Sequence, residues 1–238
     1  MFAQCKNYGI FDTRSSAAMK MQKHLNTATW LAIIIYAVGL TCFLIPELEP
    51  WMMRLTPVNI LMAMAAALLF HKKWSSGFVA AALMIALGGY CIEVAGVKTG
   101  AIFGAYSYQS TLGFAALGVP LILSVNWFFL VYATRSLAQS WVKDPLLLSF
   151  IAAALMTGYD FIMEPVAVRY DFWTWDAGFI PLQNYIAWFV ISFLFHYLFL
   201  KWVPMNANPF AQRLLAIQVV FFAVLHVQAN GALAGLFR

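Results

Sequence analysis

Charged side chains are scarce in this sequence. Of its 238 residues, 10% are Asp, Glu, Lys or Arg, and 63% are hydrophobic. Soluble domains carry about 25% charged residues, so a soluble chain of this size would have too few charges to cover its surface. The composition therefore excludes a soluble enzyme and a soluble nucleic-acid-binding protein.

Paired cysteines and clustered metal ligands are also lacking. Cys5, Cys42 and Cys91 are odd in number and form no CxxC motif, which excludes a disulfide scaffold. The four histidines are isolated from one another, whereas membrane di-iron hydroxylases and desaturases bind their metal through clustered histidines. No GxGxxG motif follows a predicted strand, so no dinucleotide fold is indicated. We therefore expect neither a metal nor a cofactor.

What the chain has instead is a series of apolar runs, and about 18 apolar residues suffice to span a membrane. The fifth run follows Asp144, a suitable N-cap, and has Pro145 at the first helical position. We expect it to end before Pro165, because the residue before a proline leaves the α region. Seven runs are predicted, at residues 29–45, 51–70, 76–94, 114–132, 145–164, 181–200 and 209–233.

These runs predict an all-α fold, a polytopic membrane helical bundle with about seven transmembrane helices. Residues 1–28 form a polar cytoplasmic N-terminal lead in this interpretation, and residues 29–238 form a single transmembrane domain. Ten of the fourteen Lys and Arg residues fall on one side of the seven runs. Since cytoplasmic loops are rich in basic residues, the N-terminus is expected inside and the C-terminus outside. The longest connections, 95–113 and 165–180, then lie together on the outer side, where function commonly gathers.

Three acidic residues are expected at that outer end. Asp160 and Glu164 are four residues apart and share a helix face, and Glu93 ends the third run at a similar depth. A carboxylate at membrane depth costs several kcal/mol unless it is paired, protonated or solvated. Because close carboxyl groups in an apolar site cannot all ionise, at least one should be protonated and able to donate a proton. The alternative is an interfacial pair bridged to Arg169 or Lys98.

Aromatic and polar residues near these acids admit two interpretations each. Trp173 and Trp175 belong either to an interfacial aromatic belt or to a wall of π faces around a developing cation. Asn184, inside the sixth run, serves either the site or simply a hydrogen bond to another helix. Glycines recur every four residues in 96–104, which is typical of a helix-packing face or of a folded loop.

Two stretches together resemble a known family. The first begins at Glu93 with E-V-A-G-V-K-T-G-A-I-F-G-A-Y-S-Y and continues to Pro120. The second begins at Asp160 with D-F-I-M-E-P-V-A, then has W-T-W and I-P-L-Q-N-Y, and ends at Tyr185. They are similar to the membrane-integral carotenoid hydratases, and the resemblance covers residues 90–188. The two motifs are specific in combination, and neither would be alone.

The resemblance implies that water adds across the terminal C=C of an acyclic carotenoid end group, giving a tertiary alcohol. Lycopene, γ-carotene or a bacterioruberin precursor would be the substrate, in a bacterial or archaeal cytoplasmic membrane. The expected partners are this carotenoid, water and membrane lipids, without nucleic acid. The competing functions are another membrane isoprenoid enzyme, such as a lycopene cyclase or a prenyltransferase, and a non-enzymatic carotenoid-binding protein.

Hydration of an alkene needs an acid, a base and stabilisation of a tertiary carbocation. We expect the Asp160 and Glu164 pair to donate the proton, with Asp160 favoured, and Glu93 to position water or act as its base. Asn184 would hold the water. The aromatic residues expected to bind the substrate are Trp173, Trp175, Tyr185, Tyr106 and Tyr108.

Overall fold

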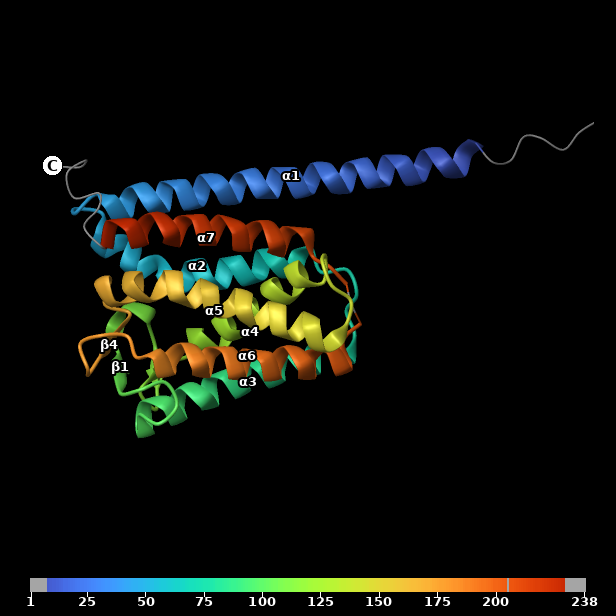
Figure 1. Ribbon diagram of the computed structural model, residues 1–238. Coiled ribbons are helices and arrows are strands. Elements are labelled where there is room, and N and C mark those ends of the chain that lie inside the picture. The colour runs from blue at the N-terminus through green and yellow to red at the C-terminus, as the bar shows by residue number, and fades with distance from the viewer. Residues whose placement is uncertain (1–7, 205, 230–238) are drawn as a thin grey trace, which may run out of the picture.

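The computed structural model describes residues 8–204 and 206–229. Within them the helices pack side by side as an elongated bundle (Figure 1). The helices are α1 (Tyr8–Leu44), α2 (Glu49–Leu69), α3 (Ser76–Thr99), α4 (Ile122–Ala138), α5 (Pro145–Arg169), α6 (Leu182–Trp202) and α7 (Pro209–Ala229). The short elements are β1 (Tyr106–Tyr108), the 3-10 helix η1 (Ser110–Leu112), β2 (Ala115–Ala116), β3 (Val119–Pro120) and β4 (Trp173–Trp175).

Among the described residues, six helices are long and apolar enough to cross a membrane, and α4, with 17 residues, is shorter. These helices support an all-α polytopic membrane bundle. The apolar part of α1 is Ala18–Leu44, and its N-terminal part extends beyond the other helices (Figure 1). Residues 8–28 were expected to belong to a polar lead. In the structure they form the N-terminal part of α1. The part of the seventh run beyond Ala229 lies outside the described residues.

The predicted start of the fourth helix was wrong. The run 114–132 is mostly apolar, but α4 begins only at Ile122 because residues 114–121 form a hairpin of β2 and β3. Leu117 and Gly118 make its turn with positive φ angles of 53° and 85°. The Leu121 amide donates to the Phe114 carbonyl at 3.0 Å, which closes the hairpin.

The fifth helix starts as predicted and ends later. The Asp144 side chain accepts from the Leu147 amide at 2.8 Å, which confirms the N-cap. The end predicted before Pro165 was wrong, because α5 continues through that proline to Arg169. Val166 and Ala167 are buried on this last turn, so packing compensates for the hydrogen bond that a proline cannot donate.

The two long connections meet at one end of the bundle. Helix α3 reaches Thr99, five residues beyond its predicted end, and Gly100 caps it with a left-handed φ of 64°. The glycine repeat is thus partly helical and partly loop. Strand β1 pairs antiparallel with β4, which places Tyr106 opposite Trp175 and Tyr108 opposite Trp173 (Figure 1). This pairing joins the two sequence motifs in space.

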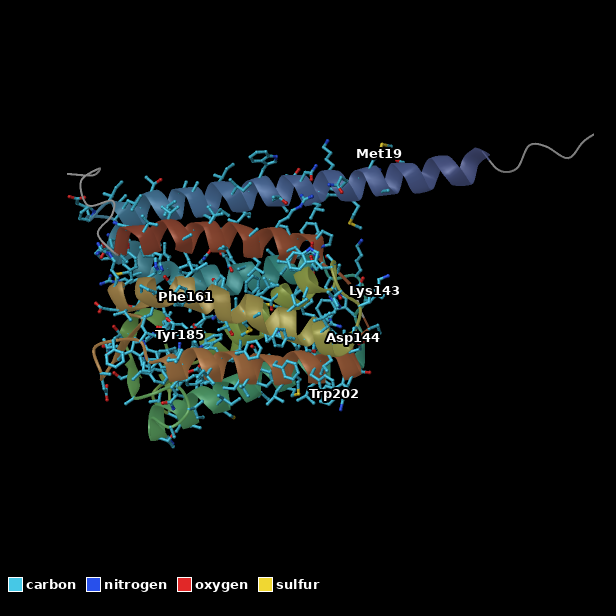
Figure 2. All side chains as sticks on the ribbon, viewed as in Figure 1. Met19, Lys143, Asp144, Phe161, Tyr185 and Trp202 are labelled. Atoms are coloured by element: carbon cyan, nitrogen blue, oxygen red, sulfur yellow. The ribbon has the colours of Figure 1, made fainter. Side chains whose placement is uncertain are left out.

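The basic α4–α5 connection lies at the other end of the bundle. Figure 2 shows Lys143 and Asp144 there, with Trp202 near the same end, whereas Phe161 and Tyr185 lie toward the β1–β4 end. Lys72 and Lys73, in the α2–α3 connection, and Lys201, in the last turn of α6, belong to the same end as Lys143, because the helices alternate in direction (Figure 1).

Candidate active site

Glu164 is held by the two tryptophans of β4. Trp173 and Trp175 each donate their indole N–H to Glu164 Oε2 at 3.0 Å. Residues two apart on a strand point to the same face, so the W-T-W sequence aims both indoles at one carboxyl group. Both tryptophans are buried, at 7% and 8% exposed. They therefore line an internal site and do not form a lipid-facing aromatic belt.

Asn184 links Glu164 to Asp160. Its amide Nδ2 donates to Asp160 Oδ2 at 3.0 Å and to Glu164 Oε1 at 3.1 Å. The spacing of the two acids on α5 and the position of Asn184 in the first turn of α6 produce this bridge. Asp160 is fully buried, and its Oδ1 has no hydrogen-bond partner among the described residues. Both protons of the amide are thus committed to the two carboxyl groups.

Glu93 has a separate set of donors. Tyr106 and Tyr108 donate their hydroxyls to its Oε2 at 2.5 Å and 2.7 Å, and Trp127 donates its indole N–H to its Oε1 at 2.9 Å. Burial, followed by the neighbouring Glu93 charge, raises the pKa of Tyr106 and Tyr108. Both phenols therefore stay protonated and keep donating to Glu93.

Trp127 and its stacking partner are members of the site that the sequence did not reveal. The Trp127 ring stacks on Trp188 with centroids 4.4 Å apart and an angle of 10° between the planes. Trp127 comes from α4 and Trp188 from α6. A tryptophan beside Asn126 in an apolar run was the available signal, but only the pairing of α3 with α4 places that tryptophan against Glu93.

A small cavity separates the two glutamates. Its volume is about 20 Å³, and both Glu93 and Glu164 line it. This volume suffices for one water molecule, which needs about 10–15 Å³ of such space and several polar partners. Asn184 and seven aromatic residues complete most of the wall: Phe103, Tyr106, Tyr108, Trp127, Trp173, Trp175 and Trp188.

Most of the predicted site residues come together here, with two differences. Asp160 does not line the cavity and contacts the site through Asn184. Tyr185 does not line it either, and its ring lies 5.4 Å from that of Phe161, where Figure 2 shows the two side by side. The ion-pair alternative is not seen among the described residues, because neither Arg169 nor Lys98 is among the hydrogen-bond partners of the three acids. Arg169 instead lies 5.7 Å over the Tyr170 ring.

Two of the three acids, Asp160 and Glu164, lie on α5, and Glu93 lies on α3. Within the described ranges, no group of three or more His, Cys, Asp or Glu side chains is placed to hold a metal ion. The donors around the two glutamates are N–H and O–H groups, which bind carboxylates by hydrogen bonds. The arrangement suits the transfer of protons between carboxyl groups and a small molecule between them.

Residues 51–236 match the model of the carotenoid biosynthesis protein family. The chain belongs to this family. It is also similar to a bisanhydrobacterioruberin hydratase from Haloarcula japonica, with 30% identity over 122 residues. That match covers 45% of this chain and 40% of the relative, so less than half of the relative's length is spanned. No solved structure matches the chain.

Membership of the carotenoid biosynthesis protein family confirms the resemblance given by the two motifs. Both motifs lie within the residues that match the family. Together with the hydratase relative, this supports a carotenoid-modifying role for the chain, as an enzyme of carotenoid biosynthesis.

Proposed function

We propose that this protein is a carotenoid hydratase, which adds water to the terminal C=C of an acyclic carotenoid end group and forms a tertiary alcohol. The observation that carries the proposal is the water-sized cavity between Glu93 and Glu164. Two carboxyl groups on either side of one water are what an acid-catalysed addition needs. The hydratase relative supports the same chemistry.

The first step is protonation of the alkene. Asp160 and Glu164 share the Asn184 amide, and two neighbouring carboxyl groups in a buried site hold one proton in preference to none. Glu164 lines the cavity and Asp160 does not, so Glu164 is the proton donor and Asp160 is a positioning residue acting through Asn184. This revises the expectation that Asp160 donates. The proton adds to the less substituted alkene carbon, and the π electrons form the new C–H bond.

The second step is capture of the tertiary carbocation. The π faces of Trp173 and Trp175 and the negative charge of the acids stabilise the cation. Water attacks the cationic carbon through its oxygen, and Glu93 takes the proton that water releases. This proton returns across the cavity to Glu164, so that both acids are restored and one water is consumed. One alkene carbon gains the hydrogen and the other gains the hydroxyl, and the reaction needs no oxidant or reductant. Tyr106 and Tyr108 hold Glu93 in place and form part of the wall.

The site lies at the outer end of the bundle in the topology that we propose. Helix α4 reverses the chain between α3 and α5 as a crossing helix would, which supports a count of seven crossings. Basic residues gather at the opposite end, in the α2–α3 and α4–α5 connections and the last turn of α6, which supports a cytoplasmic N-terminus. Residues 29–238 then form one domain in a bacterial or archaeal cytoplasmic membrane, and water reaches the site from outside.

The test is expression in cells that accumulate lycopene, followed by mass analysis of the extracted pigments. We expect lycopene to gain the mass of one or two waters. Glu164→Gln should lower this conversion by about 10²–10⁴-fold, which is the usual contribution of a general acid. An isomer of unchanged mass would indicate a cyclase instead. Conversion of neither lycopene nor γ-carotene would contradict the hydratase.

A further inference from the structure

The acid cavity has room for a water molecule but not for a hydrocarbon chain. A second cavity of about 410 Å³ lies beside it, lined by residues of α1, α2, α4, α5 and α7 together with the connections at the β1–β4 end. This volume falls within the range of about 300–1,000 Å³ that is typical of small-molecule sites. We call this second cavity the groove.

The groove adjoins the acid cavity. Four residues line both spaces: Leu123, Asn126, Met163 and Trp173. Trp173 presents its ring to the groove while its indole N–H bonds Glu164, so one side chain connects the apolar space with the acid. The Asn126 side chain lines both spaces and makes no hydrogen bond to another described residue, which leaves its amide available to a water or hydroxyl at this junction.

The groove is also open sideways, between α1 and α2. Residues of both helices on its rim are about half exposed: Val38 at 57%, Ile35 at 46% and Val58 at 48%. In a membrane-spanning bundle such apolar side chains face lipid tails, since the apolar face of a helix needs no cover there. The side opening therefore leads into the hydrocarbon layer and not into water.

Four polar residues of the groove wall, unlike Asn126, bind one another. Gln218 donates to the Tyr36 hydroxyl at 2.7 Å, and Asn59 donates to the same hydroxyl at 3.1 Å. Tyr159 donates to Gln218 Oε1 at 3.4 Å. Because these groups satisfy one another, the wall suits an apolar ligand that offers no hydrogen bonds.

The groove is shorter than a whole carotenoid. Along α1 it extends from Ile34 to Phe43, which is about 14 Å at a rise of ~1.5 Å per residue. An extended carotenoid is about as long as the hydrocarbon core is thick, near 30 Å. Roughly half of the molecule fits inside, and the remainder must leave through the opening between α1 and α2.

We propose that the groove binds the terminal isoprenoid segment of the carotenoid, which enters sideways from the bilayer between α1 and α2. Its reacting end reaches the junction at Met163 and Trp173, and its far half stays among the lipid tails. This inference rests on the proposed function, because it places the substrate of that reaction. It assigns substrate binding to α1, α2 and α7, outside the two sequence motifs.

Gly39 gives a direct test, because it lines the groove and has room for a side chain. A Cβ there would lie 3.8 Å from Phe221 Cε2, which is an ordinary contact. Gly39→Phe therefore fills the groove without a backbone clash. Gly158→Phe is the matched control, since a Cβ at Gly158 meets nothing within 4 Å and Gly158 does not line the groove.

Two readouts follow each variant: hydration of lycopene in cells, and the amount of lycopene that stays bound to the detergent-purified full chain. We expect Gly39→Phe to lower both by about tenfold or more, a barrier or binding change of ~1.4 kcal/mol. Gly158→Phe should match the unmodified protein in both. Should Gly39→Phe fail to fold, Val58→Trp blocks the opposite rim, with the exposed Leu87→Trp on α3 as its control.

The outcomes separate this inference from the proposed function. If the unmodified protein hydrates lycopene and Gly39→Phe does so equally well, the groove does not bind the substrate and the hydratase stands. If neither the unmodified protein nor any variant hydrates lycopene or γ-carotene, the proposed function fails. The amount of lycopene retained by each variant then still tests whether the groove binds a carotenoid. Loss of retention confined to Gly39→Phe or Val58→Trp would support the groove, and equal retention in all variants would overturn it.

Discussion

Two buried polar clusters lie toward opposite ends of the bundle, and they differ in what surrounds them. At the β1–β4 end, Glu93 and Glu164 accept hydrogen bonds around a cavity. At the other end, Arg135 is 3% exposed, donates to the Val203 carbonyl at 2.8 Å and lies 4.5 Å over the Phe199 ring. The first cluster buries acids beside open space, and the second buries a cation against backbone.

The second cluster ties connections together. Asn208 donates to the Ala67 carbonyl at 2.7 Å and to the Tyr132 hydroxyl at 2.9 Å, which joins the α6–α7 connection to α2 and α4. Ser136 accepts from the Asn208 amide at 2.7 Å. None of these residues lines the acid cavity or the groove. Burial of a polar group therefore does not by itself indicate a site, and the neighbouring cavity is what distinguishes the acid end.

Of the substitutions at the two ends, Glu93→Gln should have the largest effect on the hydration of lycopene. Glu93→Gln keeps the size of the side chain and removes the base, so we expect hydration of lycopene to fall by about 10²-fold or more. Pigment masses from equal amounts of membrane protein measure it. Tyr108→Phe is the control, because it removes one of three hydrogen bonds to Glu93 and leaves the carboxylate. Full activity in Glu93→Gln would remove the base from the mechanism.

A smaller effect is expected at the wall between the groove and the acid. Trp173→Phe keeps an aromatic face and removes the N–H that binds Glu164. Loss of one charge-assisted hydrogen bond should lower the hydration rate about tenfold, or ~1.4 kcal/mol. Trp173→Leu removes the aromatic face as well and should lower the rate further. Equal rates for the Phe and Leu variants would mean that the ring does not stabilise the cation.

Substitution in the Arg135 cluster should lower the stability of the protein and leave the hydration reaction unchanged. Arg135→Met removes the donor to the Val203 carbonyl and leaves that acceptor unpaired, which costs roughly 1–3 kcal/mol. Thermal unfolding in detergent should shift downward, while hydration per folded molecule stays unchanged. Lys143→Met, at an exposed position, is the control for loss of charge. A hydration defect in well-folded Arg135→Met would contradict the division into two kinds of cluster.

The smallest effect concerns pH at the Arg135 end. Burial lowers the pKa of His71 below its ordinary value of 6.5. Its neutral ring fits its partners, with Nδ1 2.8 Å from the Tyr132 hydroxyl and Nε2 3.0 Å from the Lys73 carbonyl. The stability that the neutral His71 ring contributes is fully present above its ordinary pKa of 6.5. It is lost as the pH falls through the lowered pKa of the folded protein. Unfolding temperatures between about pH 8 and pH 5 should therefore fall less for His71→Phe than for the unmodified chain.

The sequence predicts the helices well where a polar signal marks their ends. Asp144 and Pro145 begin α5 as expected, and the spacing of Asp160 and Glu164 places both on one face. The start of α4 could not be predicted, because the hairpin at 114–121 is as apolar as the helix that follows. The end of α5 could not be predicted either. Pro165 indicates a helix end, but the packing of Val166 and Ala167 keeps the helix going to Arg169.

The sequence also could not predict the rotation of each helix about its own axis. Membrane helices are apolar all round, so the pattern does not say which face is internal. For this reason the sequence placed Tyr185 in the site, whereas the structure packs it on Phe161. Asp160 likewise contacts the site only through Asn184. Trp127 donates to Glu93 because α3 packs on α4.

The source of the product oxygen tests water addition most directly. Membranes that contain the full chain and lycopene are incubated, without oxygen gas, in water labelled with heavy oxygen. We predict a tertiary alcohol that carries the heavy label, and loss of this product in Glu164→Gln. An alcohol without the label, or one whose formation requires oxygen gas, would contradict acid-catalysed hydration between Glu93 and Glu164.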